Sequence, residues 1–213
     1  MDRLQFLLSP LMKYGFVLIG HSMGGLVARV FARRVTSPLR DLLRGVALLG
    51  TPNGGALGGS LVVSAMLDWA DWLTGPNPYA RSPLCLSALQ LTLNDKEKVI
   101  HDLNKQDRED PPKIPILSIS GGQNYLEFGK PSARAFTGAV RNTLLQRLIG
   151  ENPNDGLVAE SSANLSQVLG ISTSLMQHQN KYADYRRTNH THLIRNQAIT
   201  NLIVQWLQKD LSL

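Results

Sequence analysis

The sequence predicts an α/β protein with three layers, helices covering both faces of a mostly parallel sheet. Three short segments are predominantly apolar, Phe16–Gly20, Gly45–Gly50 and Ile114–Ser120. Runs of this kind are typical of strands that are buried on both faces of a parallel sheet. Segments with helical periodicity separate them, and the alternation of strand and helix favours the α/β class.

The chain of 213 residues is long enough for one domain with a substantial core. We expect a single domain over 1–213, with a helical insertion at about 56–112. Within this insertion, Gly58–Leu73 has the pattern of a helix with a wide apolar face. Ser87–Lys105 is also expected to be helical, before a charged stretch that reaches Pro112. The insertion fits either a lid over an acyl pocket or helices that pack in an ordinary core.

The remaining elements follow in chain order. An amphipathic segment at Arg3–Lys13 is expected to pack on the sheet. A helix is expected at Ser22–Val35, with core contacts from Ala28, Val30 and Phe31. A short helix is expected at Ala139–Leu148. The polar segment Gln177–Tyr185 predicts a last strand at the edge of the sheet. The chain closes with an amphipathic helix over Asn196–Leu207, whose predicted core face consists of Ile199, Leu202, Ile203 and Trp206.

The formal net charge is +6 and the sequence pI is about 9.7. No basic block is interleaved with aromatic residues, so nucleic acid is not an expected partner. The pairs Arg33-Arg34 and Arg186-Arg187 are interpreted as solvated faces, although contact with an anionic membrane surface or a phosphate-bearing substrate is an alternative. Cys85 is the single cysteine, and the N-terminus has no convincing signal peptide. These features favour the cytoplasm.

One stretch carries the clearest chemical signal, the G-x-S-x-G of residues 20–24, read as Gly20-His21-Ser22-Met23-Gly24. It lies between a predicted strand and a predicted helix, the context of a nucleophile elbow. Gly20 and Gly24 are expected there because larger residues would collide with the neighbouring strand and helix. The backbone N–H of Met23 would face a developing oxyanion. The alternative is a glycine-rich turn that contains a serine by chance.

The elbow and the following helix, GHSMGGLVAR, together with LLGTPNGG at Leu48–Gly55, resemble the lipase and esterase branch of the α/β-hydrolase superfamily. The similarity is greatest to bacterial lipase-like and inositol-deacylase-like serine hydrolases. This resemblance implies the α/β-hydrolase fold, with Ser22 as the nucleophile. In such hydrolases several strands precede the nucleophile strand, whereas only 15 residues precede Phe16. The chain therefore resembles the C-terminal two thirds of the fold, without the loop that supplies a second oxyanion N–H.

The resemblance also implies two partners for Ser22. Asp155, in a D-G-L-V turn, corresponds to the acid of the triad, and its alternative reading is a plain Asn/Asp/Gly turn. His190, in Asn189-His190-Thr191-His192-Leu193-Ile194-Arg195, corresponds to the base. His192 is the rival for that role. The order Ser22, Asp155, His190 is the order of α/β hydrolases.

The candidate substrate contacts belong to two loops that resemble those bordering the site in such hydrolases. Residues 51–55 follow the predicted strand at Gly45–Gly50, at the end where ligands approach open α/β sheets. A plain Pro/Gly turn is the alternative reading of this loop. His21 belongs to the elbow itself and is expected to point away. The candidate substrate contacts are His21, Thr51, Pro52 and Asn53.

Together these features favour a serine hydrolase that cleaves carboxylic esters, such as lipid or acyl esters, through an acyl-enzyme. An acyltransferase with the same triad is one alternative. A catalytically incomplete, hydrolase-like interaction module is another, favoured by the short segment before the elbow. The sequence has no CxxC, HExxH, P-loop or dinucleotide fingerprint, so neither a metal nor a cofactor is expected. The oligomeric state is not determined by any of these patterns.

Overall fold

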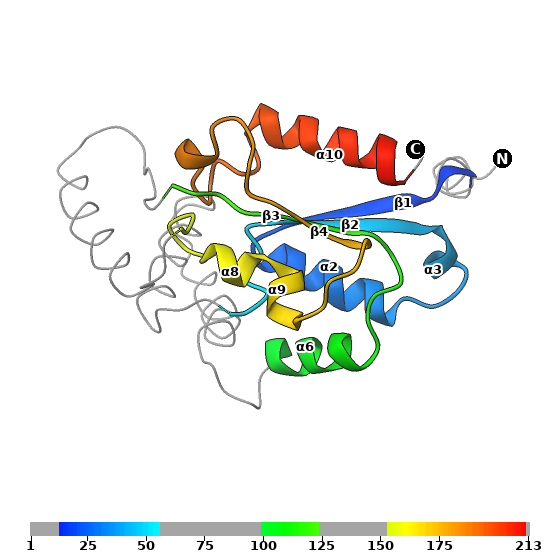
Figure 1. Ribbon diagram of the computed structural model, residues 1–213. Helices are drawn as coiled ribbons and strands as arrows, with labels where there is room; N and C mark the ends of the chain where they lie inside the picture. The colour runs from blue at the N-terminus through cyan, green and yellow to red at the C-terminus, as the bar shows by residue number, and fades with distance from the viewer. Residues whose placement is uncertain (1–12, 56–98, 124–152, 212–213) are drawn as a thin grey trace, which may run out of the picture.

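The computed structural model describes residues 13–55, 99–123 and 153–211, and its strands form one parallel sheet (Figure 1). The order of the strands in the sheet is the order in the sequence. The predicted α/β class is confirmed. The last strand lies at an edge of the described sheet, as predicted, but it spans Met176–Gln179, and the prediction that it continues to Tyr185 is wrong because a 3-10 turn begins there. The described strands are β1 (Phe16–His21), β2 (Leu43–Leu49), β3 (Ile116–Ile119) and β4 (Met176–Gln179).

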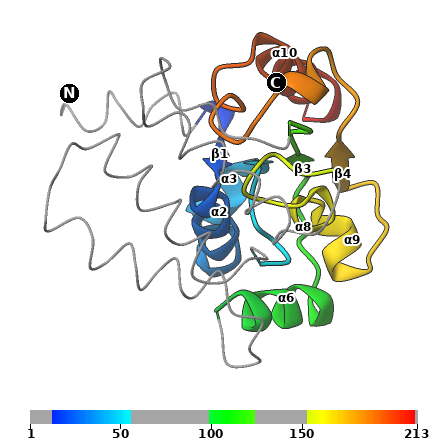
Figure 2. The same ribbon diagram turned by 90° about the vertical axis from the view of Figure 1, so that its left-hand side faces the viewer.

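Helices cover both faces of this sheet. Figures 1 and 2 place α10 on one side, and α2, α9 and α6 on the other. The longer helices are α2 (Met23–Arg34), α6 (Val99–Glu109) and α10 (Gln197–Asp210). The shorter ones are α3 (Leu39–Leu42), α8 (Glu160–Ala163), α9 (Leu165–Leu169) and the 3-10 turn η1 (Tyr185–Arg187). No helix in these described ranges is long and apolar enough to cross a membrane.

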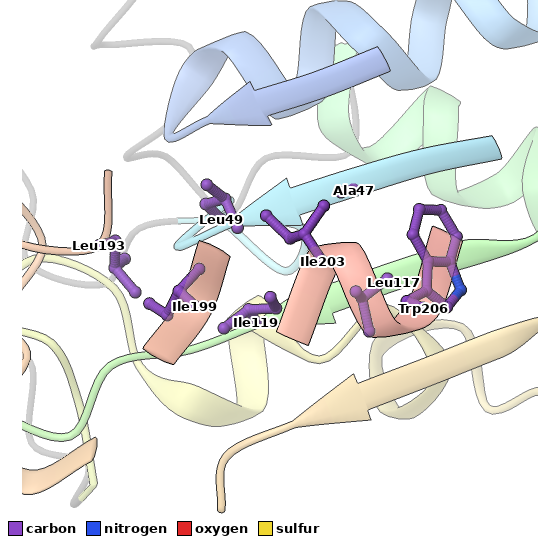
Figure 3. Close-up of a cluster of buried hydrophobic side chains, with 8 residues drawn as sticks. All are labelled: Ala47, Leu49, Leu117, Ile119, Leu193, Ile199, Ile203 and Trp206. Atoms are coloured by element: carbon purple, nitrogen blue, oxygen red, sulfur yellow. The ribbon is translucent and has the colours of Figure 1, made fainter. Parts of the chain in front are cut away.

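Alternate residues of the central strands supply two cores. Ala47 and Leu49 of β2 face α10, and Figure 3 shows them packed with Ile199, Ile203 and Trp206. The opposite face of β2 packs on α2 and α9, through a cluster of Ala28, Val46, Leu48, Ile116, Leu165, Leu169 and Met176. The side-chain period of 2 in a strand explains this division. The predicted core positions Ile199, Ile203 and Trp206 of the last helix are confirmed, whereas Leu202 is only partly buried and lies outside this cluster.

Strand β1 departs from the burial that its composition predicts. Within the described residues only β2 pairs with it, so β1 lies at the edge of the described sheet. Ile19 is 56% exposed, and only Gly20 of the strand is buried. The predicted strand is therefore confirmed, whereas the prediction that it is buried is wrong. A uniformly apolar sequence predicts burial on both faces, and an edge position removes much of it.

Helix α2 contacts the core through a face that matches the predicted one only in part. Ala28 is buried as predicted and Val30 packs against a buried cluster, but Phe31 is exposed and touches the ring of Phe16 at its edge. Leu26 packs against Ile100 and Leu103 of α6 instead. The face turned toward α6 is thus part of the buried surface of α2, and no sequence period identifies it.

A buried polar network joins α2 to α6. The Arg29 guanidinium donates to the Asp107 carboxylate at 2.7 Å and to the Asn104 side chain at 2.8 Å. Arg33 donates to the other oxygen of Asp107 at 3.0 Å. These ion pairs explain why α6 continues through the charged stretch to Glu109, where a helix end near residue 105 was predicted. Arg33 is therefore paired and only partly exposed, so its interpretation as part of a solvated face is wrong. Arg34, Arg186 and Arg187 are exposed, as that interpretation expects.

Several predicted segments lie outside the described residues. They are the segment at Arg3–Lys13, apart from its last residue, the helix at Gly58–Leu73, most of the helix at Ser87–Lys105, and the short helix at Ala139–Leu148. Most of the insertion at 56–112, for which a lid is one of the two interpretations, also lies outside the described residues. Only its C-terminal part, which forms α6, is described.

Replacing Asp107 with alanine is expected to destabilise the protein by about 3–5 kcal/mol, because the buried Arg29 charge loses its partner. Chemical denaturation measures this free energy of unfolding. Asp110→Ala is the matched control, since that side chain is exposed and lies 3.9 Å from Arg33, which is too far for a hydrogen bond. It should cost no more than about 1 kcal/mol. Equal effects of the two substitutions would contradict a structural role for the network.

Candidate active site

The carboxyl ends of β1, β2 and β3 converge on one edge of the sheet. The backbone N–H of Ser22 donates to the carbonyl of Leu49 at 2.9 Å, and that of Gly50 donates to Ile119 at 2.8 Å. The residues that follow these three strands are therefore neighbours in space. This edge is where open parallel sheets bind ligands.

Ser22 lies between β1 and α2 in a backbone conformation that L-residues rarely adopt. Its φ is 55° and its ψ is −128°, and α2 begins at the next residue. A positive φ of this kind costs roughly 1–3 kcal/mol in a residue other than glycine. Met23 is the first residue of α2, so its N–H has no acceptor within the helix. The strand, sharp turn and helix predicted around Ser22 are all present.

The glycines of this turn do not all have the role that their spacing predicts. A Cβ atom at Gly20 would lie 2.5 Å from the Cα of Gly25, so the prediction for Gly20 is confirmed. At Gly24 a Cβ would meet no atom of the described residues within 4 Å, and this prediction is wrong. The crowded helical glycine is Gly25, where a Cβ would lie 1.9 Å from the Thr51 hydroxyl oxygen. The second glycine of the pair is thus the one that packing requires.

Asp155 and His190 meet at the same edge although 35 positions separate them. Nδ1 of His190 lies 2.7 Å from Oδ2 of Asp155, and both side chains are almost fully buried. The backbone N–H of His190 also donates to the Asp155 carbonyl at 2.8 Å. The carboxylate accepts, so Nδ1 carries the proton and the lone pair is on Nε2. That Nε2 is buried and has no hydrogen-bond partner among the described residues.

The Asp155 carboxylate is stabilised by the turn in which it lies. Its Oδ1 accepts from the backbone N–H groups of Leu157 at 3.0 Å and Val158 at 2.8 Å. Gly156 has a φ of 95°, which lets the chain turn back so tightly. Together with His190 these donors satisfy a carboxylate that has almost no contact with solvent.

Gly50 is a further requirement of the site that the sequence did not reveal. A Cβ at this position would lie 2.8 Å from Oδ2 of Asp155 and 3.0 Å from Nδ1 of His190. Its φ of 52° also favours glycine. The glycine that ends GVALLG is the only available signal, and the sequence predicts it as the last residue of the strand, whereas β2 ends at Leu49. Its absence of a side chain lets the Asp155–His190 pair approach β2.

The prediction that His21 points away from the site is wrong, because the side chain lies against His190. Its ring lies 4.6 Å from the His190 ring, centroid to centroid, with an interplanar angle of 43°. Its Nε2 lies 2.9 Å from the backbone carbonyl oxygen of His190. Burial and the neighbouring His190 lower the pKa of His21 to about 4. His21 is therefore neutral near pH 7 and is bound to the loop that carries His190.

The other predicted contacts differ in their surroundings. Thr51 and Asn53 are fully buried, and Pro52 is buried as well. Asn53 accepts from Arg29 at 3.1 Å and donates to the Ala163 carbonyl at 2.8 Å. Its side chain thereby connects α2 to α8. Substrate contact by His21, Thr51, Pro52 or Asn53 remains a prediction.

Neither His192 nor the Ser22 hydroxyl is joined by a hydrogen bond to the Asp155–His190 pair among the described residues. His192 is half-buried, and within the described residues its imidazole makes no hydrogen bond to Asp155. No hydrogen bond joins the Ser22 hydroxyl to His190 among those residues either. No group of three or more His, Cys, Asp or Glu side chains in the described ranges could hold a metal ion.

Comparison with solved structures finds similar proteins at low sequence identity. The lipase BlEst2 of Bacillus licheniformis in its mature form is 16% identical, with a TM-score of 0.43, over 96% of this chain and 69% of that one. The propeptide form gives 16% identity and a TM-score of 0.49, over 97% and 38%. An α/β superfamily hydrolase of Oenococcus oeni PSU-1 gives 15% and 0.44, over 97% and 71%. No family model and no curated protein matches the chain.

Substituting alanine at the two helical glycines is expected to give opposite results. Gly25→Ala should lower the free energy of unfolding by about 1–3 kcal/mol, because its methyl group would overlap Thr51. Gly24→Ala should be neutral or stabilising by up to about 1 kcal/mol, since alanine favours a helix. Urea denaturation of the two variants makes the comparison. Destabilisation at Gly24 alone would show that the elbow packs differently.

The pKa of His21 predicts a loss of stability in acid. The unfolded chain protonates this residue near pH 6.5, whereas the folded chain holds its pKa at about 4. Between these values the unfolded state binds more protons, so stability falls as the pH is lowered. Relative to His21→Gln, the wild type should lose up to about 3 kcal/mol between pH 6.5 and pH 4. A difference between the two proteins that does not vary with pH would contradict the lowered pKa.

Proposed function

We propose that the chain is a serine hydrolase of the α/β-hydrolase type that cleaves carboxylic esters. Ser22 is the nucleophile, His190 the general base and Asp155 the acid that orients the base. The observation that carries the proposal is the buried hydrogen bond between Asp155 and His190, at the sheet edge where the strained Ser22 turn lies. An acid, an imidazole and a hydroxyl in such an arrangement support acyl transfer.

The first half of the reaction forms the acyl-enzyme. Nε2 of His190 accepts the Ser22 hydroxyl proton while Oγ attacks the carbonyl carbon of the ester. The backbone N–H of Met23 donates to the oxyanion, and the start of α2 adds a favourable field. The intermediate collapses, the ester C–O bond breaks, and the alcohol leaves with the proton from the imidazolium. Asp155 keeps Nδ1 protonated throughout and stabilises the imidazolium.

The second half regenerates Ser22. His190 accepts a proton from water, whose oxygen attacks the acyl carbon. The new intermediate collapses to the carboxylic acid, and Ser22 Oγ recovers its proton from the imidazolium. The substrate class follows from the resemblance of the elbow and of residues 48–55 to lipases and esterases. We therefore infer lipid or other acyl esters, and the net charge of +6 leaves contact with an anionic membrane surface as a prediction.

A hydrolase-like interaction module without activity is the second candidate function. One observation favours it, since no hydrogen bond joins Ser22 to His190 among the described residues. Hydrogen bonds of catalytic groups are often long in unliganded enzymes and shorten when substrate binds. The buried Asp155–His190 pair supports the hydrolase instead, because a module that only binds partners has no need for a desolvated imidazole whose Nε2 has no partner among the described residues.

Ser22→Ala should abolish turnover of p-nitrophenyl esters and covalent labelling by a fluorophosphonate probe, because both require the hydroxyl. His190→Gln and Asp155→Asn should each lower kcat by a factor on the order of 10⁴. His192→Gln is the matched control and should retain activity within a few-fold. Turnover that survives at His190→Gln and disappears at His192→Gln would move the base to the rival position. A wild-type chain that neither turns over esters nor labels would favour the module.

A further inference from the structure

His190 is bound to the rest of the protein through three of its four polar groups. Its backbone N–H and its Nδ1 both bind Asp155, at 2.8 Å and 2.7 Å. Its carbonyl oxygen lies 2.9 Å from Nε2 of His21. Only Nε2 of His190 has no partner among the described residues. The residue is thus fixed on two sides, by Asp155 and by His21, with its basic nitrogen left open.

The bond from His21 has a defined direction. A carbonyl oxygen can only accept, so Nε2 of His21 must carry the hydrogen and donate it. The rings of the two histidines also lie against each other, with centroids 4.6 Å apart. His21 is bonded to the next residue, Ser22, whose N–H is held by Leu49. The same two-residue segment therefore carries the hydroxyl and holds the backbone of the base.

We propose that His21 is a positioning residue, which sets the place of His190 relative to Ser22 through its Nε2–H bond to the His190 carbonyl. This inference deepens the proposed function and rests on it. His21 touches neither substrate nor reacting atoms in this role, and it acts through His190. A displacement of about 1 Å between base and nucleophile costs on the order of 10²-fold in rate. A short hydrogen-bonded link that fixes His190 relative to Ser22 therefore supports the reaction rate.

The charges around His21 fit this role. Among the described residues, the groups that act on its charge are the His190 ring and the Asp155 carboxylate. The neutral form of His21 keeps a second positive charge away from His190 when that ring becomes an imidazolium. Asp155 then compensates a single charge. Burial and the proximity of His190 keep the pKa of His21 at about 4, so this holds at neutral pH.

Two substitutions separate the hydrogen bond from the ring. His21→Gln retains an N–H donor at a similar reach, and His21→Phe retains an aromatic ring without a donor. We expect His21→Phe to lower kcat by about 10-fold to 100-fold with less than about a 3-fold change in KM. His21→Gln should recover kcat to within about 5-fold of the wild type. Ester turnover measures both constants, and thermal unfolding establishes that each variant is folded at the assay temperature.

A second readout requires no activity. Imidazole ¹⁵N spectra of the full chain report the tautomer of His190, which should carry its proton on Nδ1 in the wild type and in His21→Gln. In His21→Phe this signal should broaden or shift as the loop loses its anchor. Unchanged kcat and spectra in folded His21→Phe would overturn the proposal. Equal loss of kcat in both variants would also overturn it, because the N–H donor retained in His21→Gln would then restore no activity.

These outcomes are distinct from a failure of the proposed function. A wild-type chain without ester turnover or fluorophosphonate labelling removes the hydrolase assignment. In that case the ¹⁵N comparison of the wild type, His21→Gln and His21→Phe still decides whether His21 holds His190. If the wild type is active and His21→Phe has the same kcat and the same ¹⁵N spectra, His21 has no positioning role and the hydrolase assignment still stands.

Discussion

The arrangement of the site depends on the buried carboxylate of Asp155. A charge that is 1% exposed must be compensated within the protein, and here two backbone N–H groups and the His190 ring provide the donors. The requirement constrains several segments at once. The turn after Asp155 must fold back on its own carboxylate, the loop at His190 must approach, and β2 must be followed by a residue without a side chain. Gly50 satisfies the last condition because its missing Cβ leaves space for both partners.

The fold was predictable where the chemistry is local. Apolar runs located β1, β2 and β3, since a buried strand needs nothing more than uninterrupted apolar side chains. The burial of β1 was not predictable, because it depends on which strand lies next to it in space, and Ile19 is in fact exposed. The length of α6 was not predictable from the sequence either. Its last turn is stabilised by Asp107, whose partners Arg29 and Arg33 are more than 70 positions away.

The candidate site divides in the same way. Ser22 was predicted from a five-residue motif, and its strained turn is present because strand, turn and helix are adjacent in sequence. Asp155 and His190 were inferred by resemblance, and the structure brings them to one another. The assignments that failed involve contacts between distant segments. Gly25, not Gly24, is the crowded glycine because Thr51 packs there, and His21 turns toward His190 because the loops after β1 and β4 meet.

The positive φ of Ser22 has a consequence for how this sequence can change over time. Glycine would adopt the same backbone without strain, so a single substitution there would make the folded chain more stable and remove the hydroxyl. A gain in stability and retention of the hydroxyl therefore favour different residues at this one position. Under the proposed function, a lineage that no longer needed the reaction would have an energetic reason to lose the serine first, while its strands and helices stayed in place.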